Sequence, residues 1–202
     1  MTTQTTAPVT RYRFTADQYE EMVRAGILTR DDRVELIDGE VVAMPPMGEG
    51  HSYSVYRKNR LFNRAFGDVA GVLVQAPIRL DTGAMPEPDI ALLRLPDERY
   101  RSARPGPADI FLVVEVADTS LAYDRRTKAR IYAQAGIPEY WVHNINQDIL
   151  IVLRDPTQEG YRSVTQLGRG DRIALLAFPD RELAVSDLLG EPPAEELDSR
   201  AV

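Results

Sequence analysis

The chain has 202 residues, 44% of them hydrophobic and 27% charged, which suits one folded domain with its own core and argues against a disordered chain. It contains no cysteine, which excludes disulfides, thiolate metal sites and a cysteine nucleophile, and which fits a reducing cytoplasm. The net charge of −7 argues against non-specific coating of nucleic acid, although "YRKNRLFNR" and "DRRTKAR" are locally basic.

The hydrophobic pattern predicts neither a membrane span nor a signal peptide. No apolar run approaches the roughly 18 residues that a transmembrane helix needs. The opening "MTTQTTAPVT" lacks the charged and apolar parts of a signal peptide. We therefore expect a cytoplasmic protein with a flexible start over residues 1–10, one domain over residues 11–190 and a flexible acidic tail over residues 191–202.

Helices and strands alternate irregularly along the predicted domain. The predicted elements, in chain order, are a helix in "RYRFTADQYEEMVRAGIL" that begins at Thr15 or Asp17 and ends near Gly26, a hairpin in "DRVELIDGEVVAM" with its turn at Asp38-Gly39, a helix from about His51 to Phe66, strands in "GVLVQAPIRLD" and "EPDIALLRL", a loop from Pro96 to Pro107, a strand in "DIFLVVEVA", a helix in "SLAYDRRTKARIYAQAG", and strands in "PEYWVHNI", "DILIVLRD", "YRSVTQL" and "DRIALLAF".

The strand "DIFLVVEVA" is apolar on both faces, so we expect it to lie in the centre of a sheet. Helices fall early and in the middle of the chain, and most strands follow one another directly. The predicted fold class is therefore α/β or mixed α+β, with one sheet that carries helices on its faces. The apolar strand "ILIVL" is a candidate edge, and we expect a homodimer through it.

Two acids occupy unusual places beside apolar strands. Asp89 follows a proline and opens the strand of "MPEPDIALL", and Glu115 stands among valines near the end of the later strand. The intervening loop contains no crossover helix, so a hairpin connection predicts antiparallel strands with both carboxylates at one end of the sheet. The competing interpretations are an acid that caps a turn for Asp89, and a solvent-facing or arginine-paired acid for Glu115.

Lys128 is the third candidate. Helical steps from Lys128 pass through Leu121, Asp124, Ile131 or Tyr132, and Ala135, the stripe that should face the sheet. An inward lysine needs a carboxylate partner, and this helix begins soon after Glu115. The alternative is an exposed pair of Asp124 and Lys128 on the helix surface.

Two carboxylates and a lysine at one sheet edge fit metal-assisted phosphodiester hydrolysis. Mg²⁺ takes oxygen ligands from one or two carboxylates, and substrate phosphate completes its shell. The metal activates water and polarises the phosphoryl oxygen, while an ammonium stabilises charge that develops on phosphorus. Other constellations are missing from the chain, which has no phosphate-binding glycine loop, no HExxH and no GxSxG.

The ordered segments "RVELIDGEVVAMPP", "PDIALL", "DIFLVVEVADTS" and "YAQAGIPEYWV", together with His51 and Lys128, resemble the Uma-two family of endonucleases within the PD-(D/E)XK superfamily. The resemblance covers roughly residues 12–153. It implies a restriction-endonuclease-like fold, a central mixed β-sheet flanked by helices, and a Mg²⁺- or Mn²⁺-dependent endonuclease that acts on nucleic acid, with DNA preferred.

The resemblance also assigns roles by position. The superfamily signature is Pro-Asp followed by an acid, any residue and a lysine, which matches Pro88, Asp89 and Glu115 but meets Ala117 where lysine is expected. In this family the lysine is taken to have moved to the next helix, which matches Lys128. Asp89 and Glu115 would hold the metal. Glu35 matches an early acid that serves as a further ligand, unless it forms a surface pair with Arg33.

Four further residues are candidates for substrate contact. His51 heads the apolar stripe of its helix and either fills a structural position or contacts phosphate. Gln75 is a polar residue in an apolar segment. Arg125 and Arg126, with the basic helix after His51, could guide the nucleic-acid backbone. The competing function is a catalytically silent nucleic-acid-binding or protein-interaction module on the same fold, and a third is a phosphodiesterase for small nucleotides or RNA.

Overall fold

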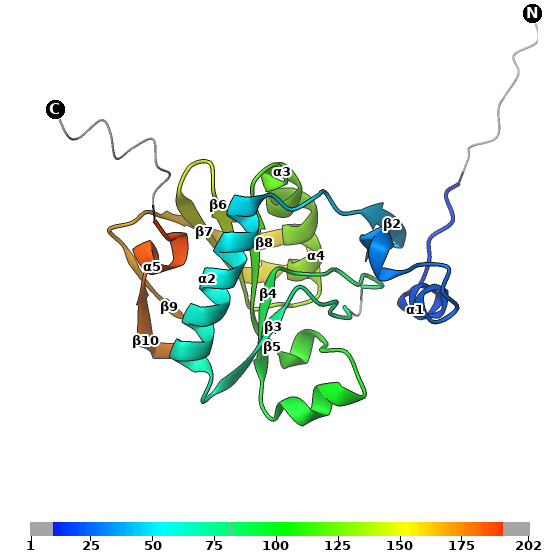
Figure 1. The fold of residues 1–202 in the computed structure, drawn as a ribbon, viewed down its shortest axis with the longest axis horizontal. Helices are drawn as coiled ribbons and strands as arrows, with labels where there is room; N and C mark the ends of the chain where they lie inside the picture. Colours follow the sequence, from blue (N-terminus) through cyan, green and yellow to red (C-terminus); the bar gives the residue numbers. More distant parts are fainter. Residues whose placement is uncertain (1–9, 81, 192–202) are drawn as a thin grey trace, which may run out of the picture.

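The structure is a computed structural model that describes residues 10–80 and 82–191 (Figure 1). The predicted ends, residues 1–10 and 191–202, lie outside the described residues apart from Thr10 and Glu191. The helices and strands in chain order are α1 (Ala16–Arg24), β1 (Val34–Ile37), β2 (Glu40–Ala43), α2 (Glu49–Phe66), β3 (Ala70–Val74), β4 (Ile90–Arg94), β5 (Ile110–Ala117), α3 (Leu121–Tyr123), α4 (Ala129–Gln134), β6 (Glu139–Asn144), β7 (Ile149–Thr157), β8 (Gly160–Leu167), β9 (Arg172–Leu175), β10 (Phe178–Ala184) and α5 (Val185–Leu189).

Six strands form the central sheet in the order β3-β4-β5-β6-β7-β8. Neighbouring strands are antiparallel except β5 and β6, which run parallel because the chain crosses over between them through α3 and α4. The sheet is therefore mixed, as predicted. Strand β5 lies inside it, and all but one of its residues are buried.

Helices cover the two faces of the sheet unequally (Figure 1). The long helix α2 crosses one face, where its buried Val55, Phe62 and Phe66 pack against Trp141 and the apolar residues of β4 and β5. Helix α5 and the small β9–β10 hairpin complete this layer. Helix α4 covers the other face, where Ile131 and Tyr132 join a second core.

The β1–β2 hairpin and α1 form a small third unit beside the sheet (Figure 1). Asp38 and Gly39 both have positive φ, the backbone that a tight hairpin turn requires, as the Asp-Gly signal predicts. Leu36 exchanges two backbone hydrogen bonds with Met85, at 2.8 and 3.3 Å. These bonds attach the hairpin to the segment before Asp89, so Glu35 is carried to the end of the sheet.

Several sequence expectations differ from the structure, among them the strand in "DRIALLAF", which ends at Leu175 and turns into β10. The strand predicted in "GVLVQAPIRLD" ends at Val74, because Gln75 has a φ of +44° and turns the chain away from the sheet. The expected edge strand "ILIVL" is wrong, since β7 lies between β6 and β8. The predicted helix after Ser120 is present, but a π-helical turn, Asp124–Lys128, separates α3 from α4.

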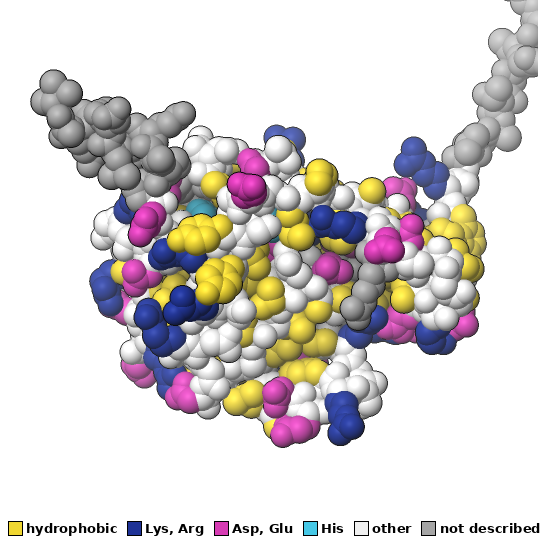
Figure 2. Space-filling view, viewed as in Figure 1, with side chains coloured by type: hydrophobic (Ala, Val, Ile, Leu, Met, Phe, Trp, Pro, Cys, Tyr) yellow, Lys and Arg dark blue, Asp and Glu magenta, His cyan; other side chains and the backbone are white. Residues whose placement is uncertain are grey.

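The surface carries charges of both signs, and hydrophobic side chains gather over β3 and β4 beside α2 (Figure 2). None of the described helices has the length and apolar character that a membrane crossing demands.

Candidate functional site

Asp89 and Glu115 meet at one end of the sheet. The antiparallel register pairs Ile90 with Val114, which sets the residue before β4 next to Glu115. The backbone N–H of Asp89 donates to Glu115 Oε2 at 3.3 Å, and the N–H of Val116 donates to Asp89 Oδ2 at 2.8 Å. Both side chains are buried. The antiparallel hairpin inferred from the sequence therefore brings the two acids together.

Lys128 faces the sheet and contacts two acids. Its Nζ lies 3.0 Å from Glu115 Oε1 and 3.2 Å from Glu35 Oε2. Asp124 and Lys128 are both buried, so the alternative of an exposed helix-surface pair is wrong. Glu35 is buried too, and its contacts with Lys128 and with the N–H of Glu87 replace the surface pair with Arg33.

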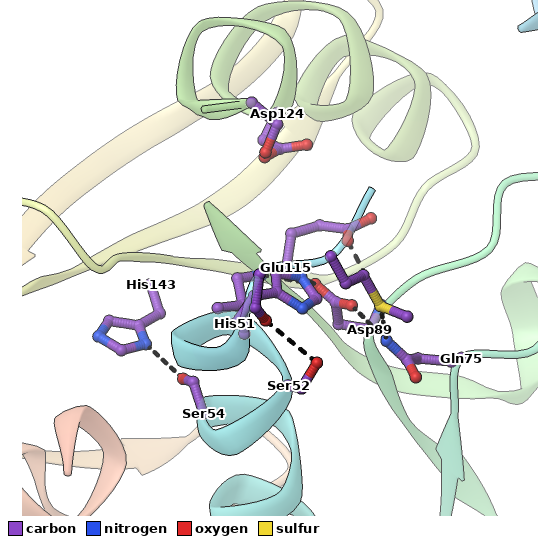
Figure 3. A network of polar contacts seen from close by, with 12 residues as sticks. His51, Ser52, Ser54, Gln75, Asp89, Glu115, Asp124 and His143 are labelled. Atoms are coloured by element: carbon purple, nitrogen blue, oxygen red, sulfur yellow. Dashed lines mark hydrogen bonds and ion pairs between the residues drawn. The ribbon is translucent and has the colours of Figure 1, made fainter. Parts of the chain in front are cut away.

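His51 and Gln75 both bind Asp89 (Figure 3). His51 Nε2 lies 3.0 Å from Asp89 Oδ2, and Gln75 Nε2 donates to Asp89 Oδ1 at 3.2 Å. His51 comes from the first turn of α2, and Gln75 from the turn that ends β3. The structure thus places both predicted residues against the first acid, where they fix its orientation.

The predicted helical stripe turned Tyr132, or its neighbour Ile131, toward the sheet, but it did not identify Tyr132 as a partner of Glu115. Tyr132 Oη donates to Glu115 Oε1 at 2.8 Å, so this oxygen accepts two hydrogen bonds, from the tyrosine and from Lys128. A signal was present, because Tyr132 lies four residues after Lys128 and therefore on the same helix face.

More acids than cations are buried at this sheet edge. Burial, reinforced by the charges of Asp89, Asp124 and Glu35, raises the pKa of Glu115 to about 8, although the Lys128 ammonium opposes the rise. Burial likewise raises the pKa of Asp124 to about 6. Lys128 stays protonated, because its acidic neighbours outweigh its burial and hold its pKa well above the ordinary value. One ammonium therefore does not neutralise the carboxylates around it.

The pKa of Asp89 is lowered, in contrast to the raised pKa values of Glu115 and Asp124. Burial alone would raise its pKa, but the hydrogen bonds from His51, Val116 and Gln75 bring the pKa below the ordinary value. It is therefore ionised at neutral pH, with its oxygens bound by His51, Gln75 and the N–H of Val116.

The donor set fits a hard divalent cation. Carboxylate oxygens are the ligands that Mg²⁺ prefers, and buried negative charge in excess of positive charge favours a cation. No cluster of three or more His, Asp or Glu residues suited to a metal occurs within residues 10–80 and 82–191. A cation held by Asp89 and Glu115 would therefore complete its shell with water and phosphate, the usual arrangement for Mg²⁺.

A cavity of about 880 Å³ opens above the two acids. Its polar end holds the predicted site, and its other walls come from α1, the β1–β2 hairpin and the segment after β3. Arg33 and Arg104 also line it. Arg125 and Arg126 do not, because their exposed side chains lie on the π-helical turn outside the lining. The structure thus brings six of the eight predicted residues together and leaves these two apart.

A second buried polar cluster lies next to the site, on the α2 face. Lys58 Nζ lies 2.6 Å from Ser54 Oγ and 2.7 Å from His143 Nδ1, and Ser54 Oγ lies 2.9 Å from the same nitrogen (Figure 3 shows Ser54 and His143). Lys58 belongs to the basic helix that was expected to guide the nucleic-acid backbone, but its side chain is 0% exposed and does not reach the surface. The sequence held the signal, since Lys58 falls between Val55 and Phe62 on the apolar stripe.

Replacement of Lys58 with methionine should stabilise the protein, most strongly at and below neutral pH. Burial lowers the pKa of Lys58 from 10.5 to about 7, so between those values folding releases a proton and stability rises with pH. Burial of Lys58 therefore lowers the free energy of unfolding by several kcal/mol near and below pH 7, and by little near pH 10. Thermal unfolding of wild type and Lys58→Met across pH 6–10 measures this difference.

The exposed neighbour offers a control, because Arg60→Met should shift stability equally at every pH. A Lys58→Met protein that is less stable than wild type at pH 7 would show that the hydrogen bonds of Lys58 outweigh the cost of its burial.

A family model and two solved structures resemble this chain. The model of the family Uma2, described as "Putative restriction endonuclease", matches residues 16–186. A crystal structure described as a putative nuclease belonging to DUF820, from Anabaena variabilis ATCC 29413, aligns with a TM-score of 0.65 and 14% identity over 87% of this chain and 97% of that one. The type IIG restriction endonuclease BpuSI aligns with a TM-score of 0.39 and 16% identity, over 76% of this chain and 17% of that one.

Curated proteins yield no match to this chain. The Anabaena likeness, at its low identity, concerns the fold alone. Together with the mixed sheet and its flanking helices, it confirms the predicted restriction-endonuclease-like fold class.

Proposed function

The chain belongs to the Uma2 family, and from that membership we propose that it is a Mg²⁺-dependent endonuclease that hydrolyses phosphodiester bonds of DNA. One observation carries the proposal. Asp89 directly before β4, Glu115 in β5 and Lys128 in the π-helical turn line one cavity, with a surplus of buried carboxylates. Such a surplus is costly for folding unless protons or a cation neutralise it.

Asp89 and Glu115 would hold the cation, and Glu35, whose carboxylate lies 3.2 Å from Lys128 Nζ, would position that ammonium from the hairpin. A bound Mg²⁺ supplies an activated water and a polarised phosphoryl oxygen. His51 and Gln75 bind the carboxylate of Asp89, which lines the cavity, and would hold it in place. The site thus has its acids oriented before substrate arrives, which is the arrangement that lowers a barrier most.

Lys128 would act as a cation and not as a base. Its acidic neighbours keep it protonated, so it donates hydrogen bonds and stabilises negative charge that develops on the phosphoryl oxygens. Lys128 would take the role of the signature lysine from the helix. On the strand, Ala117 stands where the signature has lysine. The 3.0 Å contact with Glu115 supports this role.

The silent-module alternative predicts an arginine against Glu115 and a distant Lys128. The partners found for Glu115 are Lys128, Tyr132 and the N–H of Asp89, which favours the nuclease proposal. We keep DNA as the proposed substrate. A homodimer also stays a proposal, without the edge contact first assigned to β7.

Lys128→Met should slow DNA cleavage by about 10²–10³-fold while Mg²⁺ still binds. The variant loses the ammonium that faces the phosphate but keeps both carboxylates, and the loss of a positive charge favours the cation. Cleavage of plasmid DNA in Mg²⁺ or Mn²⁺, compared with samples in chelator, measures the rate. Calorimetric titration measures the binding.

The control removes an exposed cation outside the cavity, and Arg162→Met on β8 should cleave like wild type. Equal cleavage by wild type and Lys128→Met would contradict the role given to Lys128. Wild type that cleaves no DNA or RNA with either metal would contradict the proposed function.

A further inference from the structure

The outer face of α2 carries two tyrosines and three arginines in one stripe. Tyr53 is 53% exposed and Tyr56 is 56% exposed. Arg57, Arg60 and Arg64 follow Tyr53 at steps of four, three and four residues, so they share its side of the helix. We call these five residues the α2 stripe. Figure 2 shows dark-blue and yellow side chains next to one another over this helix.

The positive charge of the α2 stripe is not neutralised. In the part of the chain that the structure describes, Arg57, Arg60 and Arg64 form no ion pair with a carboxylate. Other surface arginines do form ion pairs with carboxylates: Arg169 pairs with Asp148, and Arg181 pairs with Asp68. On a protein with a net charge of −7, an uncompensated basic stripe marks a surface for a polyanion.

The tyrosines make this surface more specific than a plain basic patch. The guanidinium of Arg57 lies 5.8 Å from the Tyr53 ring centroid, and that of Arg60 lies 5.9 Å from the Tyr56 ring centroid. Each ring has an arginine guanidinium next to it and remains about half exposed. Rings that stack on bases, next to cations that contact phosphates, are the features that bind single strands. In a duplex the bases are stacked on one another, so only the arginines would find a partner.

The α2 stripe leads to the candidate site. Three residues of helix separate the two tyrosines by about 4.5 Å along the axis, close to the roughly 3.4 Å between stacked nucleotides of one strand. His51 precedes Tyr53 by two residues at the same end of α2, and its Nε2 lies 3.0 Å from Asp89 Oδ2. A strand that follows the helix from Arg64 to Tyr53 therefore arrives at the end of α2 that contacts the acids.

We infer that the α2 stripe binds single-stranded DNA and guides an unpaired strand to Asp89 and Glu115. The inference deepens the proposed function and rests on it for the choice of DNA. Tyr53 and Tyr56 stack on bases, while Arg57, Arg60 and Arg64 contact phosphates. The preferred substrate is then DNA with an unpaired segment, such as a flap, a loop or a frayed end.

Fluorescence anisotropy without divalent metal tests the inference separately from cleavage. The probe is an oligothymidylate of about 16 nucleotides, the upper range of a single-strand site. Tyr53→Leu and Tyr56→Leu should each weaken its binding by about tenfold or more, because base stacking is lost. Tyr53→Phe and Tyr56→Phe keep the rings and should bind like wild type. Arg60→Ala should reduce the slope of log affinity against log salt by about 0.7, whereas the tyrosine variants should leave that slope unchanged.

A duplex probe and an RNA probe show which results would contradict the inference. A duplex of the same length should bind more weakly than the single strand and should not respond to the tyrosine variants. Equal single-strand binding by wild type and Tyr53→Leu/Tyr56→Leu overturns the inference, and so does tighter binding of duplex. An oligouridylate that binds more tightly than the oligothymidylate overturns the choice of DNA. The control Arg162→Ala, on edge strand β8, should change neither affinity nor preference.

Cleavage and binding can fail independently. If metal-dependent cleavage is found but the tyrosine variants bind and cut normally, the proposed function stands and the α2 stripe has no part in it. If the stripe binds single strands as expected but no cleavage occurs, the binding inference stands and the proposed function falls.

Discussion

Asp89→Asn should abolish metal-dependent DNA cleavage, with a loss of at least about 10³-fold in rate. The change removes one negative charge where the cation would bind, and metal catalysis contributes several kcal/mol of transition-state stabilisation. Asparagine keeps the size of the side chain and an oxygen that accepts from the N–H of Val116, so the fold should persist. Initial rates on plasmid DNA, with circular dichroism as a check of folding, measure the effect.

A surface acid provides the matched control. Asp180 is exposed on β10 and lies outside the cavity, so Asp180→Asn should cleave at the wild-type rate. Cleavage by Asp89→Asn within about tenfold of wild type would place the chemistry elsewhere, because a tenfold change corresponds to only about 1.4 kcal/mol.

Glu115→Gln should abolish cleavage as well, yet it should stabilise the metal-free protein by about 1–4 kcal/mol at pH 8. Glutamine removes a buried negative charge and can still accept hydrogen bonds from Lys128 and Tyr132. Lys128 is not left alone, because Glu35 lies 3.2 Å from its ammonium. Thermal unfolding in chelator, for wild type and variant, measures the gain.

The pH dependence of that gain has a definite sign. The pKa of Glu115 rises from 4.5 in the unfolded chain to about 8 in the folded protein, so the folded state holds a proton that the unfolded state has lost. The contribution of Glu115 to the free energy of unfolding is present in full below pH 4.5 and is lost as the pH rises through about 8. The advantage of Glu115→Gln should therefore be small at pH 5 and grow toward pH 9.

Lys128→Met provides the opposite case. It leaves Glu115 and Glu35 without their ammonium and should destabilise the metal-free protein by about 3–5 kcal/mol. If Glu115→Gln also destabilises it by such an amount, Glu115 is one half of a structural ion pair and not a poised metal ligand.

The acids of the site could be predicted because they obey local rules. Asp89 and Glu115 are adjacent through simple hairpin topology, and Lys128 faces inward through helical periodicity. Glu35 could only be proposed, because its place depends on the contact between Leu36 and Met85, which are far apart in sequence. No local pattern encodes a contact of that kind.

Lys58 shows where sequence reasoning fails. It stands in "YRKNRLFNR" among arginines, and composition alone groups it with them. Helical phase separates them, since Lys58 lies on the buried side and Arg57, Arg60 and Arg64 on the other. Its partner His143 comes from β6, so the reason for burying an amine there appears only when helix and sheet are packed. The π-helical turn at Asp124–Lys128 also carries no clear sequence signal.

Titration of Mg²⁺ by calorimetry, into wild type and Asp89→Asn in parallel, tests most directly that Asp89 and Glu115 hold a catalytic cation. Mn²⁺ serves as a second cation, and a short phosphodiester can be added to complete the shell. We expect saturable binding to wild type and none to Asp89→Asn. Equal binding to both proteins, or no binding to wild type even with the phosphodiester present, would contradict the metal site and the nuclease mechanism built on it.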